Sequence, residues 1–331
     1  MTTQTTAWCW QGPGNPTEVL HATELTLPPL APDEVLISNQ VIALNPVDWK
    51  LIRHGHPDWQ PGHIPGVDAM GVVTACGADV HHLQPGTRVA YHTDLRRPGS
   101  FARHTQVKAR ALLRVPDSLP DTAAAAFPCP GLTAWQALAK LPVLNNLPLL
   151  IAGAGSNVGR FATQLALQAG ARVFASAGPA QHAWLKQCGV TAVADYHDTD
   201  WLAQLRHAHH DQPFDAAIDL VSSAQASQLV EALGFYAHLV AVLGRVEHNP
   251  RPAFTHCISL HEIALGAQHA FGSDRQWQQL VAAGEQLLQQ MAQGQLTLPR
   301  LILSDWHRLP EQLSALEAGG QSAKYLIQVQ A

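Results

Sequence analysis

The sequence predicts an α/β protein in which a doubly wound parallel sheet accompanies a smaller β-barrel domain. Between about residues 147 and 244, short apolar strands alternate with amphipathic helices, a pattern typical of βαβ units with a parallel sheet. Before about Leu119, β-branched or alternating segments are broken by Gly and Pro, which is typical of a small, irregular barrel.

Composition restricts the partners. The chain has 331 residues, 47% hydrophobic and 14% charged, which predicts about two domains with a sizeable core. A net charge of −5 leaves no basic excess to neutralise phosphates, so we expect a small-molecule partner rather than nucleic acid or a membrane. We find no signal peptide and no run of about 18 apolar residues, and the five cysteines form no CxxC pair, so we expect a cytoplasmic protein.

The element pattern also places the domain boundaries. The barrel strands are expected in TTAWCW, DEVLISNQVIAL, DAMGVVTACG, TRVAYH and FARHTQVK, and the Ala-rich segment DTAAAAFPCPGLTAWQALAKL marks a change of domain. A long helix, RQWQQLVAAGEQLLQQMAQG, and the strands LILSDW and KYLIQVQ are expected to pack back onto the first domain. The barrel domain is therefore placed at residues 1–124 and 268–331, and a dinucleotide-binding domain at 125–267.

A glycine-rich loop is the most informative segment. In PLLIAGAGSNVGRFATQLALQAGARVFAS an apolar strand runs through a loop into a helix and then into a second strand. Small residues let the backbone approach a pyrophosphate, and the helix start offers it free N–H groups. This context favours dinucleotide binding over a merely structural turn. The expected binding residues are Gly153, Gly155, Ser156, Asn157, Val158 and Gly159.

The residues that follow this loop favour NADPH over NADH. No acidic residue lies between Gly159 and Asp195, whereas an NAD site usually carries a carboxylate at the end of the second strand for the ribose hydroxyl. Ser176 stands at this strand end as a hydroxyl donor. Because no Lys or Arg follows it directly, Lys186, His182 or Tyr196 would have to supply the phosphate contact.

Two other patterns have less specific interpretations. The chain contains no GxSxG motif, so a serine hydrolase is not expected. The histidines in HAHH, residues 207–210, lie at the end of an amphipathic helix, and we interpret them as a solvated face rather than a metal cluster.

Several motifs together resemble the medium-chain dehydrogenase/reductase superfamily along the whole chain. They are NPVDWKLIRHG, IPGVDAMGVV, FPCPGLTAWQAL, AGAGSNVG and AKYLIQV. The nearest branch is similar to the zinc-independent quinone oxidoreductases and related enone reductases. The resemblance implies a GroES-like β-domain, a Rossmann domain and a cofactor cleft between them. It also suggests a homodimer, by analogy only.

The resemblance also implies that a catalytic zinc is missing. The alcohol-dehydrogenase branch has a Cys ligand where this chain has Asn45, and a His-Glu pair where it has Val67 and Asp68. Asparagine and valine cannot replace thiolate and imidazole, and the four-cysteine structural zinc lobe has no counterpart. We therefore expect no metal, and a hydride transfer from nicotinamide to a quinone or an α,β-unsaturated carbonyl compound.

By the same resemblance, Asn45 and Asp48 stand at active-site positions. The Asn45 amide is a candidate donor to the substrate carbonyl and Asp48 would orient the loop, although both residues also suit a turn. Tyr91 is either a hydrogen-bond or proton donor or a buried structural tyrosine.

The remaining expected contacts concern the nicotinamide. The resemblance places Thr133 near its amide, Val221 and Gly244 along its far side, and Lys324 near it. The structural alternatives are a helix cap for Thr133, a strand end for Gly244 and a solvated strand position for Lys324.

Two other functions stay open at this point. One is an NADP-dependent alcohol or aldehyde dehydrogenase of the same superfamily, with metal bound in an unforeseen way. The other is a non-catalytic NADPH-binding sensor, in which the glycine loop binds the cofactor and no reaction follows.

Overall fold

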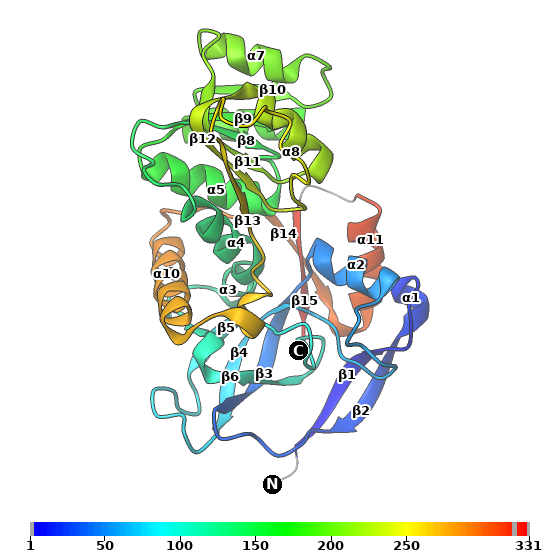
Figure 1. Cartoon of the computed structure of the whole chain (residues 1–331). Coiled ribbons are helices and arrows are strands. Elements are labelled where there is room, and N and C mark those ends of the chain that lie inside the picture. The colour runs from blue at the N-terminus through cyan, green and yellow to red at the C-terminus, as the bar shows by residue number, and fades with distance from the viewer. Residues whose placement is uncertain (1–2, 320–322, 330–331) are drawn as a thin grey trace. The chain divides into compact units, whose positions relative to one another are not determined.

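The computed structural model describes residues 3–319 and 323–329, and the chain divides into two compact units. Unit 1 contains residues 1–129 and 266–331, and unit 2 contains residues 130–265 (Figure 1). The corresponding boundaries placed from the sequence are 124/125 and 267/268. No helix in the described ranges is long and apolar enough to cross a membrane.

Unit 2 is built on a six-stranded sheet in which every neighbouring pair is parallel. Its strands, in spatial order, are β10 (Ala192–Asp195), β9 (Arg172–Ala177), β8 (Pro148–Ala152), β11 (Phe214–Asp219), β12 (Leu233–Ala241) and β13 (Ser259–Glu262). The first three strands in the chain run outward in one direction from β8 and the next three in the other, which is the doubly wound Rossmann order. The predicted parallel sheet is confirmed.

Helix α4 (Pro128–Leu138) precedes β8, and helices lie in the connections that follow β8, β9, β10 and β11. These helices are α5 (Asn157–Gln168), α6 (His182–Cys188), α7 (Trp201–Ala208) and α8 (Ser223–Leu229). Helix α7 lies against the edge strand β10 (Figure 1). Parallel strands need crossover connections, and these four helices provide them between β8 and β9, β9 and β10, β10 and β11, and β11 and β12.

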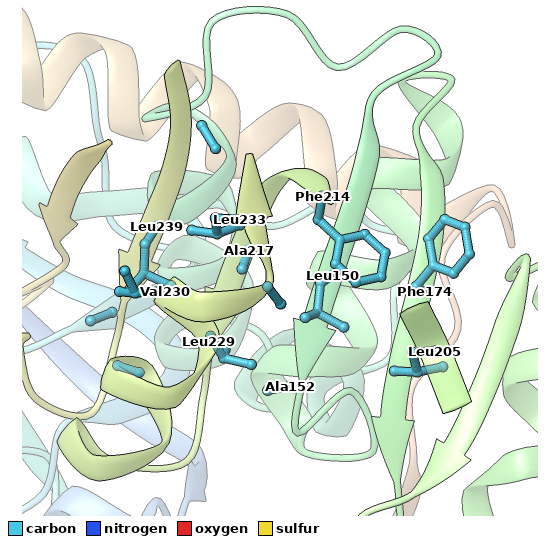
Figure 2. Packing of buried hydrophobic residues seen from close by; sticks show 14 of the residues in the cluster. Leu150, Ala152, Phe174, Leu205, Phe214, Ala217, Leu229, Val230, Leu233 and Leu239 are labelled. Carbon is cyan, nitrogen blue, oxygen red and sulfur yellow. The ribbon is translucent and has the colours of Figure 1, made fainter. Parts of the chain in front are cut away.

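The core of unit 2 lies between the sheet and its helices (Figure 2). The rings of Phe174 and Phe214 meet edge to face with centroids 5.1 Å apart, and Leu150, Leu229 and Leu239 belong to the same buried cluster. Aromatic pairs of this geometry are stabilising beyond their buried area. Apart from Leu229 of α8, these side chains come from β8, β9, β11 and β12, so the cluster packs four neighbouring strands together. The glycine loop follows β8 at one end of this packed sheet.

His209 corrects one sequence-based interpretation. It is only 7% exposed, and its ring stacks on Phe214 at 5.3 Å. The expected solvated face is therefore wrong for this histidine, although His207 and His210 are exposed. Helix α7 ends at Ala208, and the chain then turns so that the next side chain points into the core.

Unit 1 contains a seven-stranded sheet, antiparallel except for one pair, and a separate two-stranded sheet. The large sheet has the order β14 (Arg300–Asp305), β15 (Ala323–Gln328), β3 (Glu34–Ala43), β4 (Asp68–Cys76), β5 (Arg88–His92) and β7 (Leu112–Arg114), with β6 (His104–Lys108) paired to β3. The small sheet pairs β1 (Gln4–Trp10) with β2 (Leu20–Thr26). The predicted return of the C-terminal strands to the first domain is confirmed by the pairing of β15 with β3.

The helices of unit 1 are mostly short. They are α1 (Pro16–Val19), α2 (Pro46–His54), α3 (Asp121–Ala125), α9 (Gln268–Phe271), α10 (Asp274–Ala292) and α11 (Leu309–Glu317). The long helix predicted from periodicity is α10. It begins with a capping box between Ser273 and Gln276, and it buries Trp277, Leu280 and Leu288 along one face.

The aromatic core of unit 2 gives a stability prediction. Phe214→Ala removes a fully buried ring and leaves a cavity, so we expect it to lower the free energy of unfolding by about 3–5 kcal/mol in urea titrations. The matched control is Phe235→Ala in β12, where the side chain is 66% exposed, and its effect should stay within about 0.5 kcal/mol. Equal effects of the two substitutions would contradict this assignment of the core.

Candidate active site

The glycine loop joins β8 to α5 and is held by the neighbouring strand β9. The N–H of Gly153 donates to Oγ of Ser176 at 3.3 Å, and the N–H of Ala154 donates to the carbonyl of Ser176 at 2.9 Å. Ser156 is the N-cap of α5, and its Oγ accepts from the N–H of Gly159 at 3.0 Å. The loop therefore has one defined backbone path.

Two glycines are required by this path. Gly153 has a φ of +81°, which favours glycine. A Cβ on Gly159 would lie 2.4 Å from the carbonyl oxygen of Gly153, so only hydrogen fits there. Helix α5 begins directly after this loop. The N–H groups of Asn157 and Val158 in its first turn have no hydrogen-bond partner within the helix. These features fit the pyrophosphate of a dinucleotide.

Other predicted residues lie at the same edge of the sheet. Val221 follows β11 and is half exposed, and a methyl group on Gly153 would lie 3.2 Å from its Cγ2. Gly244 follows β12, and a Cβ there would lie 2.1 Å from Oγ of Ser223. Since β8 has β9 on one side and β11 on the other, the loop lies at the topological switch point where open α/β sheets bind ligands.

Asp219, which the sequence analysis did not select, shapes this edge. Its Oδ2 accepts from the N–H groups of Val221 and Ser222 at 3.3 and 3.1 Å, and its Oδ1 is buried without a hydrogen-bond partner among the described residues. Burial raises the pKa of Asp219 to about 6. A carboxylate at the end of a strand in the centre of the sheet is the signal that would have identified it.

Three other predicted cofactor residues differ in exposure. Ser176 is 2% exposed and anchors the loop, whereas Tyr196 is 53% exposed and lies beside Gly178, just after β9. Of Ser176 and Tyr196, only Tyr196 is therefore accessible to a ligand. Thr133 is buried in the middle of α4 rather than capping it.

Arg160 was also missed by the sequence analysis. It lies on the first turn of α5, and its Nη1 donates to Oε1 of Gln181 at 2.8 Å. Its guanidinium lies 3.7 Å from the ring centroid of Trp184, a cation–π contact. The Arg160 guanidinium therefore lies between α5 and α6.

Unit 1 has a buried polar cluster around the start of α2. The N–H of Asn45 donates to Oδ2 of Asp48 at 2.7 Å, and the N–H of Val67 donates to Oδ1 at 3.1 Å. Asp48 therefore joins the helix start to the segment that leads into β4. Asn45 and Asp48 together form a capping box at the start of α2, which is the turn-stabilising alternative considered for both residues.

Asp68 and Lys324 complete the cluster. Nδ2 of Asn45 donates to Oδ2 of Asp68 at 2.9 Å, and Nζ of Lys324 donates to Oδ1 of Asn45 at 2.5 Å and lies 3.9 Å from Oδ2 of Asp68. The N–H of Cys129 donates to the Asp68 carboxylate at 3.0 Å. Because Lys324 is 1% exposed, the alternative of a solvated strand residue is wrong for it.

Burial controls the charges in this cluster. It raises the pKa of Asp48 to about 8, although the hydrogen bond from the backbone N–H of Asn45 acts to lower this pKa. It also raises the pKa of Asp68, to about 6, against the opposing effect of the Lys324 ammonium. Burial therefore opposes ionisation of both carboxyl groups, and the neighbouring Lys324 side chain favours the ionised form of Asp68.

Tyr91 is fully buried, and its hydroxyl donates to Oδ1 of Asn39 at 2.7 Å. Nδ2 of Asn39 donates in turn to the carbonyl of Ala102 at 2.8 Å. Burial raises the pKa of Tyr91, which opposes ionisation of this hydroxyl. These contacts favour the structural alternative for Tyr91.

In the described ranges, no group of three His, Cys, Asp or Glu side chains is arranged to hold a metal ion. At the two positions where the alcohol-dehydrogenase branch would need thiolate and carboxylate ligands, Asn45 and Asp68 instead contact an ammonium group.

Comparison with known proteins agrees with both units. Residues 31–117 match the alcohol dehydrogenase GroES-like domain family, and residues 157–286 match the zinc-binding dehydrogenase family. A trans-enoyl reductase of Trichoderma harzianum is 33% identical over 248 residues, which cover 69% of this chain and 66% of that protein. One of Aspergillus terreus is 32% identical over 212 residues, covering 58% of this chain and 69% of that protein. The chain thus matches about two thirds of the length of these relatives.

Among solved structures, the quinone oxidoreductase from Coxiella burnetii superposes with a TM-score of 0.83 at 22% identity, covering 99% of this chain and 100% of that one. At this identity the likeness concerns the fold alone.

The helix cap predicts how the loop responds to charge. Ser156→Asp keeps a good N-cap but adds a carboxylate where the pyrophosphate would bind. We expect its NADPH dissociation constant to rise at least about tenfold, with an unchanged melting temperature, in nucleotide-fluorescence titrations. The control Ser156→Ala should lose about 1 kcal/mol of stability and keep most of the affinity. Unchanged binding by Ser156→Asp would rule out a phosphate at this helix start.

The raised pKa of Asp48 predicts a pH effect on stability. Between pH 4 and its folded pKa of about 8, the folded protein keeps a proton that the unfolded chain has lost, so stability falls as pH rises through this range. Asp48→Asn does not titrate. Its stability relative to wild type should therefore rise between pH 5 and 8, by at least about 1.4 kcal/mol, in urea unfolding. A pH-independent difference would show that Asp48 is already ionised at pH 5 in the folded protein.

Proposed function

This chain belongs to the medium-chain dehydrogenase/reductase superfamily of oxidoreductases, and we propose that it is a zinc-independent, NADPH-dependent reductase of quinones or α,β-unsaturated carbonyl compounds. The observation that carries the proposal is the buried network of Asn45, Asp68 and Lys324. Because Asn45 and Asp68 already contact the Lys324 ammonium, they are poorly placed to act as zinc ligands, and hydride transfer to a conjugated carbonyl compound can rely on hydrogen-bond donors in place of a metal.

The dinucleotide site is proposed in unit 2. The pyrophosphate would be held at the start of α5 by the loop residues Gly153, Gly155, Ser156, Asn157, Val158 and Gly159. Thr133, Val221 and Gly244 are proposed for the nicotinamide side. When bound, the reduced cofactor would supply a hydride to the substrate.

The preference for NADPH rests on the adenosine side of this site. No carboxylate lies between Gly159 and Asp195 to repel a 2′-phosphate, and the exposed Tyr196 lies next to the end of β9. We propose Tyr196 as the phosphate contact, with Ser176 acting through the loop that it anchors.

In unit 1, we propose that Asn45 and Asp48 keep the polar cluster in place. Both N–H bonds of the Asn45 amide already have acceptors, Oδ2 of Asp68 and the carbonyl of Ala43. Tyr91 is retained as a structural residue. The placement of Lys324 near the cofactor, the cytoplasmic location and the homodimer stay predictions from the sequence.

The names of the relatives support an alkene as the acceptor. The matched proteins of Trichoderma harzianum and Aspergillus terreus are trans-enoyl reductases, so reduction of a carbon–carbon double bond next to a carbonyl is the first reaction to test. Quinones contain the same conjugated unit, and they remain the second acceptor class.

The proposal predicts NADPH oxidation, followed by absorbance, with at least one member of a panel of enals, enones and ortho- and para-quinones. Turnover should be insensitive to EDTA, and kcat/KM should be at least about tenfold higher with NADPH than with NADH, the size of one charge-assisted phosphate contact.

Three outcomes would contradict the proposal in different ways. Loss of turnover with EDTA would indicate a metal-dependent alcohol or aldehyde dehydrogenase. Binding of NADPH without turnover on any acceptor would indicate a sensor. Equal use of both nucleotides would leave the reaction in place and remove Tyr196 as a phosphate contact.

A further inference from the structure

The Lys324 ammonium has more hydrogen-bond donors than the protein uses. Its side chain is almost wholly buried, and it carries three N–H groups. Within the described ranges its one hydrogen bond goes to Asn45, and Oδ2 of Asp68, at 3.9 Å, is too far for a second. Asp68 therefore balances the charge of Lys324 without filling its donors.

A buried ammonium with unused donors attracts an oxygen acceptor. Burial removes the ammonium from bulk water, and this desolvation costs free energy unless other acceptors replace the water. Hydrogen bonds from a charged donor are roughly twice as strong as neutral ones. A carbonyl oxygen that becomes negative during a reaction would therefore gain most from this group.

A second buried group with an unused polar atom lies at the same place. His92 on β5 is directly opposite Asp68 on β4, and opposed residues of an antiparallel pair share one face of the sheet. Its Nδ1 has no hydrogen-bond partner in the described part of the chain. Burial, with His269 and Lys324 nearby, lowers the pKa of His92 to about 3, so this imidazole is neutral at physiological pH.

We propose that the Lys324 ammonium binds the carbonyl oxygen of the substrate and stabilises the negative charge that develops on it during hydride transfer, with Asp68 as the residue that positions this ammonium. Asn45 acts through the same contact, because its Oδ1 accepts from Nζ and its Nδ2 donates to Asp68. Lys324 keeps its proton in this step. The inference rests on the proposed reductase function.

The test separates this role from a structural one by two variants. Lys324→Met keeps the length of the side chain and removes the charge, but it leaves Asp68 as an unpaired buried anion. We expect a lower melting temperature and a fall in kcat of about 10²–10³-fold. In the double variant Asp68→Asn with Lys324→Met, no charge is left unpaired, so the melting temperature should recover.

The decisive measurement is the kcat of the double variant, with an acceptor that the wild-type enzyme reduces. We expect kcat to stay low while NADPH affinity, read by nucleotide fluorescence, stays within about twofold of wild type. Recovery of kcat together with the melting temperature would overturn the role of Lys324 and leave the reductase function in place. Absence of turnover by the wild-type enzyme itself would refute the proposed function, and the inference with it.

Discussion

The need to balance one buried ammonium organises unit 1. Lys324 comes from the C-terminal strand β15, Asn45 from the start of α2 and Asp68 from the start of β4, so their contacts join segments that are far apart in the sequence. The N–H of Cys129 also donates to Asp68. Loss of one partner from such a buried pair typically costs about 3–5 kcal/mol. The cluster therefore adds a side-chain link between β15 and the start of unit 1, beside the backbone pairing of β15 with β3.

The sites proposed in the two units would both hold negative charge, each in its own way. Unit 2 uses the backbone: the start of α5 presents N–H groups, and Ser156 and Ser176 hold the loop around them. Unit 1 would use a side chain, because the one hydrogen bond of Lys324 within the described residues goes to the neutral Asn45 amide. The charge of a phosphate is permanent and spread over several oxygens, so several backbone N–H groups can bind it. Charge that develops on one oxygen during a reaction instead needs a donor that is fixed at one point.

Sequence patterns predicted the elements best where the signal is local. The alternation of strands and helices predicted the parallel sheet, and 3.6-residue periodicity predicted α10, because both patterns report one buried face per element. Strand β2 was missed, since its burial pattern shows one buried residue followed by mostly exposed ones, which is too weak for a period-two signal. The solvated interpretation of His209 failed because a side chain after a helix end follows the turn of the chain and not the helix face.

The same distinction applies to the candidate site. The sequence was enough to locate the glycine loop residue by residue, since strand, loop and helix are consecutive and steric limits on Gly153 and Gly159 are local. From the family resemblance it also predicted that Asn45 and Val67 do not bind zinc. Tertiary structure alone revealed that Ser176 is buried and Tyr196 exposed, that Tyr91 binds Asn39, and that Lys324 meets Asn45 and Asp68. Exposure, hydrogen-bond partners and pKa depend on side chains brought together from distant strands, and no spacing along one segment records them.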